Sequence, residues 1–452
     1  MRACVAGGGL HGKIRIGGIE KLRKKFTFTL SGGEKQRTAI AGVLSMEPKI
    51  LILDEPTSDL DPAGTKQVLE TVKRLNKDRA ITIILIEHKI DEVVGLADRT
   101  IVMDRGKIVL DGKTCDVFNR NLDILERIGI YPPHLIRLSR KLGVKPSYKE
   151  IYSYLNSLNG SFKGFSEESP TEKPSTKIIF EDVRFNYLNG TPVLRGINLE
   201  IKKGEFIALI GSNGCGKTTL LSCLIGFIKP SKGRILIDGQ DIKNLNVAEL
   251  AVKVGYLFQN PDLQLFTDTV AEEIGFGLKN RSQANDDINK KVAQALEIME
   301  LSKYRDRHPH SLSRGQRQRL AVASILSMEQ DILVLDEPTT GQDRGHLSKF
   351  LGQMKKLNDA GKTIIMITHD MSVVAEYARR TIVMEEGKIL MDGCTREVFS
   401  RPDILNRASI EPPLLARISN DLNKAGRKVP VILTFEELQY SLKIRDNPAG
   451  FR

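Results

Sequence analysis

The sequence predicts an α/β fold in two related units, of which the second is complete and the first lacks its beginning. Three observations lead to this prediction. LSGGEKQRTAIAGVLSMEPKILILDEPTSDLDP at 30–62 repeats as LSRGQRQRLAVASILSMEQDILVLDEPTTGQDR at 312–344. Apolar runs such as ILIL and TIILI have the length of buried strands. A glycine-rich loop between a strand and a helix precedes the repeated stretch in the second unit alone.

Length and composition describe an ordinary globular chain. Its 452 residues suggest about two to four domains. No apolar run approaches the roughly 18–20 residues of a membrane span, and the first residues lack the apolar core of a signal peptide. The five cysteines form no CxxC pair, which argues against zinc and dithiol redox sites. We therefore expect a cytoplasmic protein.

The net charge of +12 is compatible with three interpretations. These are a solvated basic surface, attraction to an anionic membrane face, and nucleic-acid binding. The basic residues are dispersed rather than gathered in one tract, so the first interpretation is preferred and no stable nucleic-acid partner is expected.

The two units align with almost no insertions. The offset is 282 residues from Ser31 to Ser313 and 281 residues from His88 to His369. The match fades before Ile19, whereas the second unit continues about 120 residues further upstream.

The expected organisation has five parts. An unmatched segment (1–18) precedes the incomplete unit 1 (19–158), a linker (159–176), the complete unit 2 (177–400) and its C-terminal tail (401–452). The linker NGSFKGFSEESPTEKPST is polar and contains Gly, Ser and Pro, which predicts a flexible connection.

GEFIALIGSNGCGKTTLLSCLIGFI at 204–228 predicts an apolar strand, a glycine loop and an amphipathic helix. GSNGCGKT fits the phosphate-loop pattern G-x-x-x-x-G-K-[ST] in its required context. The glycines let backbone N–H groups surround phosphate, and the helix N-terminus adds positive dipole. The lysine reaches the outer phosphates, and the first threonine is placed for magnesium. We expect a nucleotide site formed by Gly211, Ser212, Asn213, Gly214, Cys215, Gly216, Lys217, Thr218 and Thr219.

Two further apolar strands end in polar residues suited to hydrolysis. ILVLDEP ends in Asp336, suited to hold magnesium through water, and Glu337, suited to position or deprotonate the attacking water. TIIMITHD ends at His369, which is expected to contact the γ-phosphate. Upstream, Tyr187 is expected to stack on the adenine ring, and Gln259 is expected to touch magnesium and water.

LSRGQRQR opens a predicted helix shortly before the acidic strand of unit 2. A helix N-terminus presents N–H groups and positive dipole to an anion. This second signature consists of Ser313, Arg314, Gly315 and Gln316.

Together these residues resemble the ATP-binding cassette (ABC) ATPase family, from about residue 19 to about residue 440. FQNPDLQLF (258–266), VAEEIGFGL (270–278), TTGQD and the paired tails IYPPHLIRLSRKL and IEPPLLARISNDL resemble the energy-coupling factor (ECF) transporter ATPases, fused tandem forms included. The resemblance implies P-loop nucleotide-binding domains with a mixed sheet core and a helical subdomain. It also implies ATP hydrolysis with ATP and Mg²⁺.

The ECF resemblance further implies membrane partners: a transmembrane coupling protein and a separate substrate-binding protein, which together import vitamins or transition-metal ions. The expected location is peripheral, on the cytoplasmic face of the cell membrane. In ABC dimers each ATP lies between two units. Carried over, the loop at 211–219 would face Ser31, Gly32 and Gly33 of unit 1. Arg314 departs from the small glycine usual in the second signature.

GGGLHGK at 7–13 also fits the start of the phosphate-loop pattern, but the next residue is isoleucine, which has no hydroxyl. Lys13 lies only 18 residues before Ser31, whereas Lys217 lies 96 residues before Ser313. Eighteen residues cannot hold the intervening strands and helices, so this stretch is interpreted as a decoy.

Two explanations remain for unit 1: a truncated reading of a longer tandem ATPase, which we favour, or a genuine remnant with one active site. In both, Asp54, Glu55 and His88 keep the residue types of unit 2 without a phosphate loop to serve. The strands ILILD, TIILIEH and TIVMDRGKI are expected to leave an edge and apolar surface exposed.

The predicted function is ATP-driven import, with hydrolysis through Glu337 reopening units that ATP has closed. One alternative is a tandem ABC protein of the translation-factor type acting on ribosomes; it would carry a longer, charged helical linker. The other is a truncated remnant without a transport role, against which the complete set of catalytic residue types in unit 2 counts.

Overall fold

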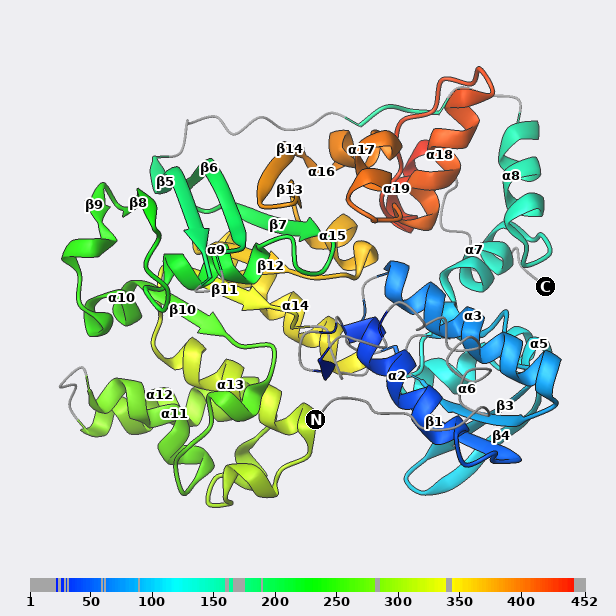
Figure 1. Ribbon diagram of the computed structural model, residues 1–452, viewed down its shortest axis with the longest axis horizontal. Helices are drawn as coiled ribbons and strands as arrows, with labels where there is room; N and C mark the ends of the chain where they lie inside the picture. The colour runs from blue at the N-terminus through cyan, green and yellow to red at the C-terminus, as the bar shows by residue number, and fades with distance from the viewer. Residues whose placement is uncertain are drawn as a thin grey trace.

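The computed structural model shows unit 2 on the left and unit 1 at the lower right, with the tail helices of both units at the upper right (Figure 1). The described residues are 22, 26–27, 30, 32–57, 60, 62–87, 90–158, 162–165, 175–187, 190–280, 285–338 and 344–442. The decoy stretch at 7–13 lies outside them.

Unit 2 is built around a six-stranded sheet in the order β10–β11–β12–β7–β13–β14. The first five strands are parallel and β14 is antiparallel to β13, so the predicted mixed α/β sheet is confirmed. All residues of β7, β11 and β12 are buried, because such strands are covered on both faces. The strands are β10 (Val254–Leu257), β11 (Ile332–Asp336), β12 (Thr363–Ile367), β7 (Phe206–Gly211), β13 (Arg380–Glu385) and β14 (Lys388–Cys394).

One face of this sheet is covered by α9 (Lys217–Leu224) and by a four-stranded antiparallel sheet. Ile332 and Val334 of β11 share a core there with Leu220 and Ile178. The antiparallel sheet has the order β6–β5–β8–β9 and comprises β5 (Thr176–Asn186), β6 (Pro192–Lys202), β8 (Lys232–Ile237) and β9 (Gln240–Asp241).

The opposite face is covered by helices. Leu333 and Leu335 alternate along β11 with the residues of the first face, as successive side chains of a strand must, and pack with Leu320 and Phe350. The covering helices are α13 (Arg314–Ser327), α14 (Arg344–Asp359) and α15 (Met371–Tyr377).

A helical subdomain extends from this face. Its helix α11 starts with a capping box: Thr269 Oγ1 accepts from the backbone N–H of Glu272 at 3.2 Å, and the Glu272 carboxylate accepts from the N–H of Thr269 at 3.1 Å. The elements here and beside the antiparallel sheet are α11 (Val270–Lys279), α12 (Asn285–Ile298), α10 (Val247–Lys253) and the 3-10 turns η3 (Ile242–Asn244), η4 (Pro261–Leu263), η5 (Ser302–Tyr304) and η6 (Pro309–Ser311).

Unit 1 repeats the later elements of unit 2. Strands β1 and β2 are parallel, and β3 and β4 form an antiparallel hairpin. Leu51 and Leu53 of β1 pack with Val68 and Val72 of a helix. The elements are α2 (Gly32–Leu44), β1 (Ile50–Asp54), α3 (Pro62–Arg79), β2 (Thr82–Ile86), α4 (Ile90–Val93), β3 (Arg99–Asp104), β4 (Lys107–Lys113), α5 (Thr114–Arg120) and α6 (Leu122–Arg127).

The repeat extends to individual side-chain contacts. Arg99 donates two hydrogen bonds to Asp111, at 2.7 and 2.6 Å, and Arg380 donates two to Asp392, both at 2.7 Å. Each arginine joins the two strands of a hairpin, and the partners are 281 residues apart in the chain. The hairpins of the two units are therefore built in the same way.

The C-terminal tails of the two units pack against each other. Leu138 and Ile151 from unit 1 share a core with Ile418 and Leu438 from unit 2. The tails thus join the units by apolar burial. The tail helices are α7 (His134–Leu142), α8 (Tyr148–Ser157), α16 (Thr395–Phe399), α17 (Pro402–Arg407), α18 (Leu414–Lys424) and α19 (Phe435–Leu442).

Residues 162–165 of the linker differ from the expected flexible connection. Phe162 is buried in the core between the tails, and Phe165 packs at its edge. The backbone N–H of Lys163 donates to the carbonyl of Ser441 at 3.2 Å. Two aromatic side chains are enough to fix this part of a Gly- and Ser-rich stretch.

Within the described ranges, no helix combines the length and the apolar character that crossing a membrane requires.

Candidate functional site

The phosphate loop connects the end of β7 to the start of α9. Gly214 and Gly216 adopt positive φ angles of 80° and 107°, which side chains rarely tolerate. A Cβ on Gly211 would lie 2.3 Å from the carbonyl oxygen of Met384, so the loop packs directly on β13. The sequence pattern predicted glycine at these places, and the backbone geometry shows why it is needed.

Lys217 points back into the loop. Its Nζ donates to the carbonyl oxygens of Gly211 and Ser212, at 2.8 and 3.0 Å. The side chain is buried at the mouth of the loop. That its positive charge meets the outer phosphate oxygens stays a prediction.

Asp336 ends β11 beside the first turn of α9. Its Oδ1 lies 3.5 Å from Thr218 Oγ1, and its Oδ2 accepts from the hydroxyl of Tyr256 at 2.8 Å. Burial raises the pKa of the Asp336 carboxyl, although these hydrogen bonds and the charge of Lys217 act in the opposite direction. Burial also raises the pKa of the Tyr256 phenol, which remains a donor to the carboxylate.

Glu337 stands at the turn that follows β11. It adopts a positive φ of 50°, and its N–H donates to the carbonyl of Ile367 at 3.0 Å, which fixes the turn against β12. Its Oε1 lies 3.2 Å from Nε2 of His369, and that nitrogen is also 3.0 Å from Oδ1 of Asn213 in the phosphate loop. The structure therefore brings acid, histidine and loop together.

Gln259 and Tyr187 lie at the borders of this site. Gln259 is exposed and follows β10, which runs parallel to β11, so it stands at the same edge of the sheet as Asp336. Tyr187 is half exposed and packs edge-on against Phe185, with ring centroids 5.1 Å apart. The hairpin that contains Tyr187 approaches the phosphate loop at Leu194, because a Cβ added to Gly216 would contact the Leu194 side chain.

The second signature begins α13 in the expected way. Ser313 is the N-cap: its hydroxyl accepts from the N–H of Gln316 at 3.3 Å, and the Gln316 side chain accepts from the N–H of Ser313 at 2.9 Å. Arg314 is exposed in the first turn, followed by Gly315.

In unit 1, Gly32 opens α2, and Gly33 is buried so closely that a Cβ would lie 3.3 Å from Cα of Gly64. Ser31 and His88 lie outside the described residues.

Asp54 and Glu55, the acidic pair of unit 1, have the same backbone arrangement as Asp336 and Glu337 of unit 2 but different surroundings. Glu55 has a positive φ of 43°, and its N–H donates to the carbonyl of Ile86 at 2.9 Å, as Glu337 does to Ile367. Asp54, however, is exposed, whereas Asp336 is buried. The expectation that Asp54 and Glu55 have no phosphate loop to serve stays a prediction.

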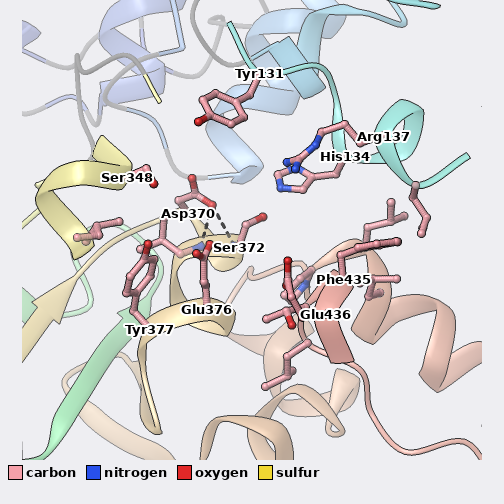
Figure 2. A pocket seen from close by; sticks show the side chains of 18 of the residues that line it. Tyr131, His134, Arg137, Ser348, Asp370, Ser372, Glu376, Tyr377, Phe435 and Glu436 are labelled. Atoms are coloured by element: carbon pink, nitrogen blue, oxygen red, sulfur yellow. Dashed lines mark hydrogen bonds between the residues drawn. The ribbon is translucent and has the colours of Figure 1, made fainter. Parts of the chain in front are cut away.

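A cavity of about 270 Å³ lies where α7 of unit 1 meets α14, α15 and α19 of unit 2. Figure 2 shows Arg137 on one side, with Asp370 and Glu376 on the other. The Asp370 carboxylate accepts from the N–H of Ser372 at 2.9 Å and so caps α15. Because Asp370 directly follows His369, one wall of the cavity continues into the histidine loop.

Comparison with known proteins explains the combination of loop, acids and signature. The ABC transporter family profile matches residues 11–58 and 194–340, one segment in each unit. A Methanosarcina mazei protein provisionally named ABC transporter ATP-binding protein is 52% identical over 95% of this chain and 76% of its own length. The chain belongs to the ABC transporter ATP-binding proteins. It is therefore an ATP-binding cassette ATPase.

Further relatives of this ABC ATPase have more specific names. One is provisionally named the HMP/thiamine import ATP-binding protein YkoD of Bacillus subtilis, with 34% identity over 88% of this chain and 72% of its own length. A solved structure of cbiO1 from Clostridium perfringens, described as part of the transporter complex cbiONQ, is 37% identical over 51% of this chain and 94% of its own, with a TM-score of 0.47.

The oxygen atoms of this ABC ATPase fit a magnesium ion. Thr218 and Asp336 offer a hydroxyl and a carboxylate close together, the hard ligands that Mg²⁺ prefers. A cation would also offset the burial that disfavours the charged form of Asp336. Together with Gln259, which stands at the same edge, these residues would hold the ion.

Sequence reasoning missed two partners in this site. Tyr256 anchors Asp336, and Asn213 connects the phosphate loop to His369. The signal for the first was available, because Tyr256 stands near the end of the strand that precedes Gln259, and a tyrosine at a strand end beside an acid is a ready donor.

Proposed function

We propose that this ABC ATPase energises import through an ECF-type membrane transporter, and that it holds one ATP between the phosphate loop of unit 2 and the signature of unit 1. The import role is supported by the import name of the Bacillus subtilis relative and by the ECF-like stretches in the sequence. The proposed substrate class is a vitamin or a transition-metal ion, chosen by a separate membrane protein.

The observation that carries the ATPase chemistry is the meeting of four side chains at one edge of the sheet. These side chains lie at or just after the carboxyl ends of the parallel strands β7, β11 and β12; they are Lys217, Asp336, Glu337 and His369. This edge is where open α/β sheets bind ligands.

Each side chain has a role in the proposed cycle. The buried ammonium of Lys217 would exchange its bonds to loop carbonyls for bonds to phosphate oxygens. The Glu337 carboxylate would accept a proton from the attacking water or orient that water. His369, held by Glu337 and Asn213, would contact the γ-phosphate and keep the carboxylate in place. Bound Mg²⁺ would supply charge compensation for the phosphates.

The membrane partner is proposed to dock beside Gln259. Leu263, Phe266 and Phe276 expose large apolar side chains there, and the two phenylalanine rings meet edge to face at 4.8 Å. The buried Glu273 carboxylate accepts from the N–H groups of residues 266 and 267, both at 3.0 Å, and so holds this apolar surface in shape. Exposed aromatic clusters of this kind are typical of protein interfaces.

This arrangement would couple the ATP site to the apolar surface on which the membrane partner docks. Gln259 lies between the phosphate loop edge and the apolar surface, so closure around ATP would move the docked partner. ATP shifts the equilibrium only through its higher affinity for the closed state. The protein would therefore lie on the cytoplasmic face of the membrane as a peripheral subunit.

The test uses Glu337→Gln, with Glu55→Gln in unit 1 as the matched control. We expect the first variant to lower ATP turnover by about 10²–10³-fold, a loss typical of removing a group that acts on the transition state, and to retain bound ATP. The control should turn over normally because the proposed site takes its catalytic acid from unit 2. Normal turnover in Glu337→Gln would refute the assigned role. Recovery of the chain with ribosomes instead of membranes after fractionation would refute the transport role.

A further inference from the structure

The cavity between the two units carries opposite charges on its two walls. One wall comes from α7 of the unit 1 tail and includes His134 and Arg137. The other comes largely from unit 2 and includes Asp370 and Glu376, on the opposite side from Arg137 (Figure 2). Among the described residues that line the cavity, none belongs to the phosphate loop or to α9. The cavity is therefore a different place from the nucleotide site of unit 2.

Arg137 lines this cavity without a carboxylate partner among the residues that the structure describes. Its guanidinium is half-buried and lies 5.8 Å from the centroid of the Tyr131 ring. By contrast, Arg140, one turn along α7, lies 3.8 Å from the Asp123 carboxylate. A half-buried charge without an opposite charge is unfavourable, and a guanidinium is suited to bind a carboxylate. Arg137 is thus placed to receive an anionic group.

The equivalent arginine of unit 2 has the partner that Arg137 lacks. Arg417 aligns with Arg137 at an offset of 280 residues, and its guanidinium lies 3.8 Å from the Glu411 carboxylate. Glu411 aligns with Tyr131 at the same offset. In the unit 1 tail, a tyrosine therefore stands where unit 2 has the neutralising acid. The charge of Arg137 is left to face the cavity.

The opposite wall is acidic. Glu376 of α15 is exposed, and it aligns with Gly95 of unit 1 at an offset of 281 residues. Glu436, in the first turn of α19, adds a second carboxylate. Burial raises the pKa of Tyr377 to about 12, and the charge of Glu376 acts in the same direction, so this phenol stays neutral beside the acid. This wall is suited to bind a cationic group.

Between the charged walls the lining is largely apolar. It includes Leu351, Val373, Leu414 and Phe435. An apolar lining with a few polar groups at fixed places is the usual form of a small-molecule site. The volume of about 270 Å³ lies just below the range of such sites, about 300–1,000 Å³, so the cavity suits a small metabolite.

The charges decide between classes of ligand. A simple anion would face the acids of unit 2, and a simple cation would face Arg137. We propose that the cavity binds a small zwitterion with an apolar side chain, of the class of the apolar amino acids, with its carboxylate on Arg137 and its ammonium group facing Glu376. The bound molecule would bridge α7 of unit 1 and α15 of unit 2. This site goes beyond the function proposed above and does not depend on it.

The experiment titrates L-leucine and L-phenylalanine into the full 452-residue chain without nucleotide and measures the heat of binding. We expect both amino acids to bind, and ATP to leave them in place. Two analogues of phenylalanine test the charges: 3-phenylpropionate lacks the ammonium group, and 2-phenylethylamine lacks the carboxylate. Each analogue should bind at least about tenfold more weakly, because it leaves one charge of the cavity without a partner.

Three variants locate the ligand. Arg137→Gln and Glu376→Gln should each weaken binding of L-phenylalanine by about tenfold or more. Tyr131→Glu supplies the acid that unit 2 has at this place, so it should weaken binding equally while the arginine remains. Arg417→Gln, which removes the equivalent arginine outside the cavity lining, is the matched control and should bind normally. The melting temperatures without amino acid should stay close to that of the parent chain, which excludes misfolding.

Hydrogen exchange tests whether the ligand bridges the units. Bound L-phenylalanine should slow exchange of the backbone amides in both 134–142 and 371–377, since it contacts a helix of each unit. Slowing in one of these helices alone would contradict the bridging geometry.

Four binding results would overturn the proposal. They are failure of both amino acids to bind, equal binding of an analogue that lacks one charge, unchanged binding in Tyr131→Glu, and displacement by ATP. The last would place the amino acid in the nucleotide site. Because these readouts need no ATP hydrolysis, loss of the ATPase role in the Glu337→Gln test would leave them standing, and the reverse holds as well.

Discussion

Nε2 of His369 lies 3.2 Å from Oε1 of Glu337, and the same nitrogen lies 3.0 Å from Oδ1 of Asn213 in the phosphate loop. The histidine thus connects the end of β12 to the loop after β7 and to the acid after β11. Because one ring nitrogen already lies close to both the acid and the loop, His369 needs little reorganisation to meet a phosphate there, which favours electrostatic catalysis.

The first prediction concerns this histidine. His369→Ala should lower kcat for ATP hydrolysis by about 10²–10³-fold, because Glu337 loses its orienting partner and the γ-phosphate loses a contact. The KM for ATP should change little, since Lys217 and the loop remain. His134→Ala is the control, because His134 pairs with Asp91 in the unit 1 tail. A raised KM with unchanged kcat would instead assign His369 to uniform binding.

The second prediction compares two aspartates. Burial raises the pKa of Asp336, so the folded state binds its proton more tightly than the unfolded state, and stability falls as pH rises through the folded pKa. Asp336→Asn should therefore raise the melting temperature of the nucleotide-free protein at pH 7, with the gain disappearing below about pH 4, near the unfolded pKa. ATP turnover should fall by about 10²-fold or more.

Asp54→Asn is the matched control for that prediction. Asp54 occupies the same place at the end of β1 but is exposed. Its substitution should change neither the melting temperature nor turnover. A lower melting temperature for Asp336→Asn at pH 7 would show that the bonds from Tyr256 and Thr218 outweigh burial.

Sequence reasoning predicted the parts of this site that are local in the chain. The phosphate loop is specified within a few residues by glycines and a lysine, and the acids and His369 stand at the ends of strands that their apolar runs reveal. The exposed apolar surface of unit 1 was also predictable, because strands of a parallel sheet need two covered faces. The exposed isoleucine side chains of β1 and β2 confirm this prediction.

The contacts that sequence reasoning missed are distant in the chain. Tyr256 and Asp336 are 80 residues apart, and Asn213 and His369 are 156 apart. Both pairs depend on the strand order β10–β11–β12–β7, which periodicity alone does not give. The fixed position of Phe162 had the same cause, because its partners come from the tail of the other unit.

The third prediction separates two glycines of the phosphate loop. In Gly211→Ala the new methyl would lie 2.3 Å from a backbone oxygen of β13, so the strand must move. We expect a loss of about 3 kcal/mol in the free energy of unfolding, the upper end for overpacking. Gly214→Ala meets open space and suffers only the strain of its positive φ, about 1–2 kcal/mol. Urea denaturation measures both, and an equal loss would contradict the packing argument.

The last prediction concerns the junction of the two tails, where Arg427 of unit 2 caps a helix of unit 1. Its guanidinium donates to the carbonyl oxygens of Leu155 and Leu158, at 3.2 and 2.7 Å, and to that of Asn156. These groups end α8, where a cation also meets the negative end of the helix dipole. Arg427→Ala leaves several carbonyls without this donor and should lower the free energy of unfolding by about 1.5–3 kcal/mol, the range for charged hydrogen bonds.

Arg401→Ala is the control for this prediction. It breaks an exposed pair with Asp403 and should cost no more than about 1 kcal/mol. Urea denaturation followed by tyrosine fluorescence compares the two, and the larger loss in Arg427→Ala should appear together with faster proteolysis between the units. Equal losses in both variants would mean that the hydrogen bonds of Arg427 stabilise the junction no more than an exposed ion pair does.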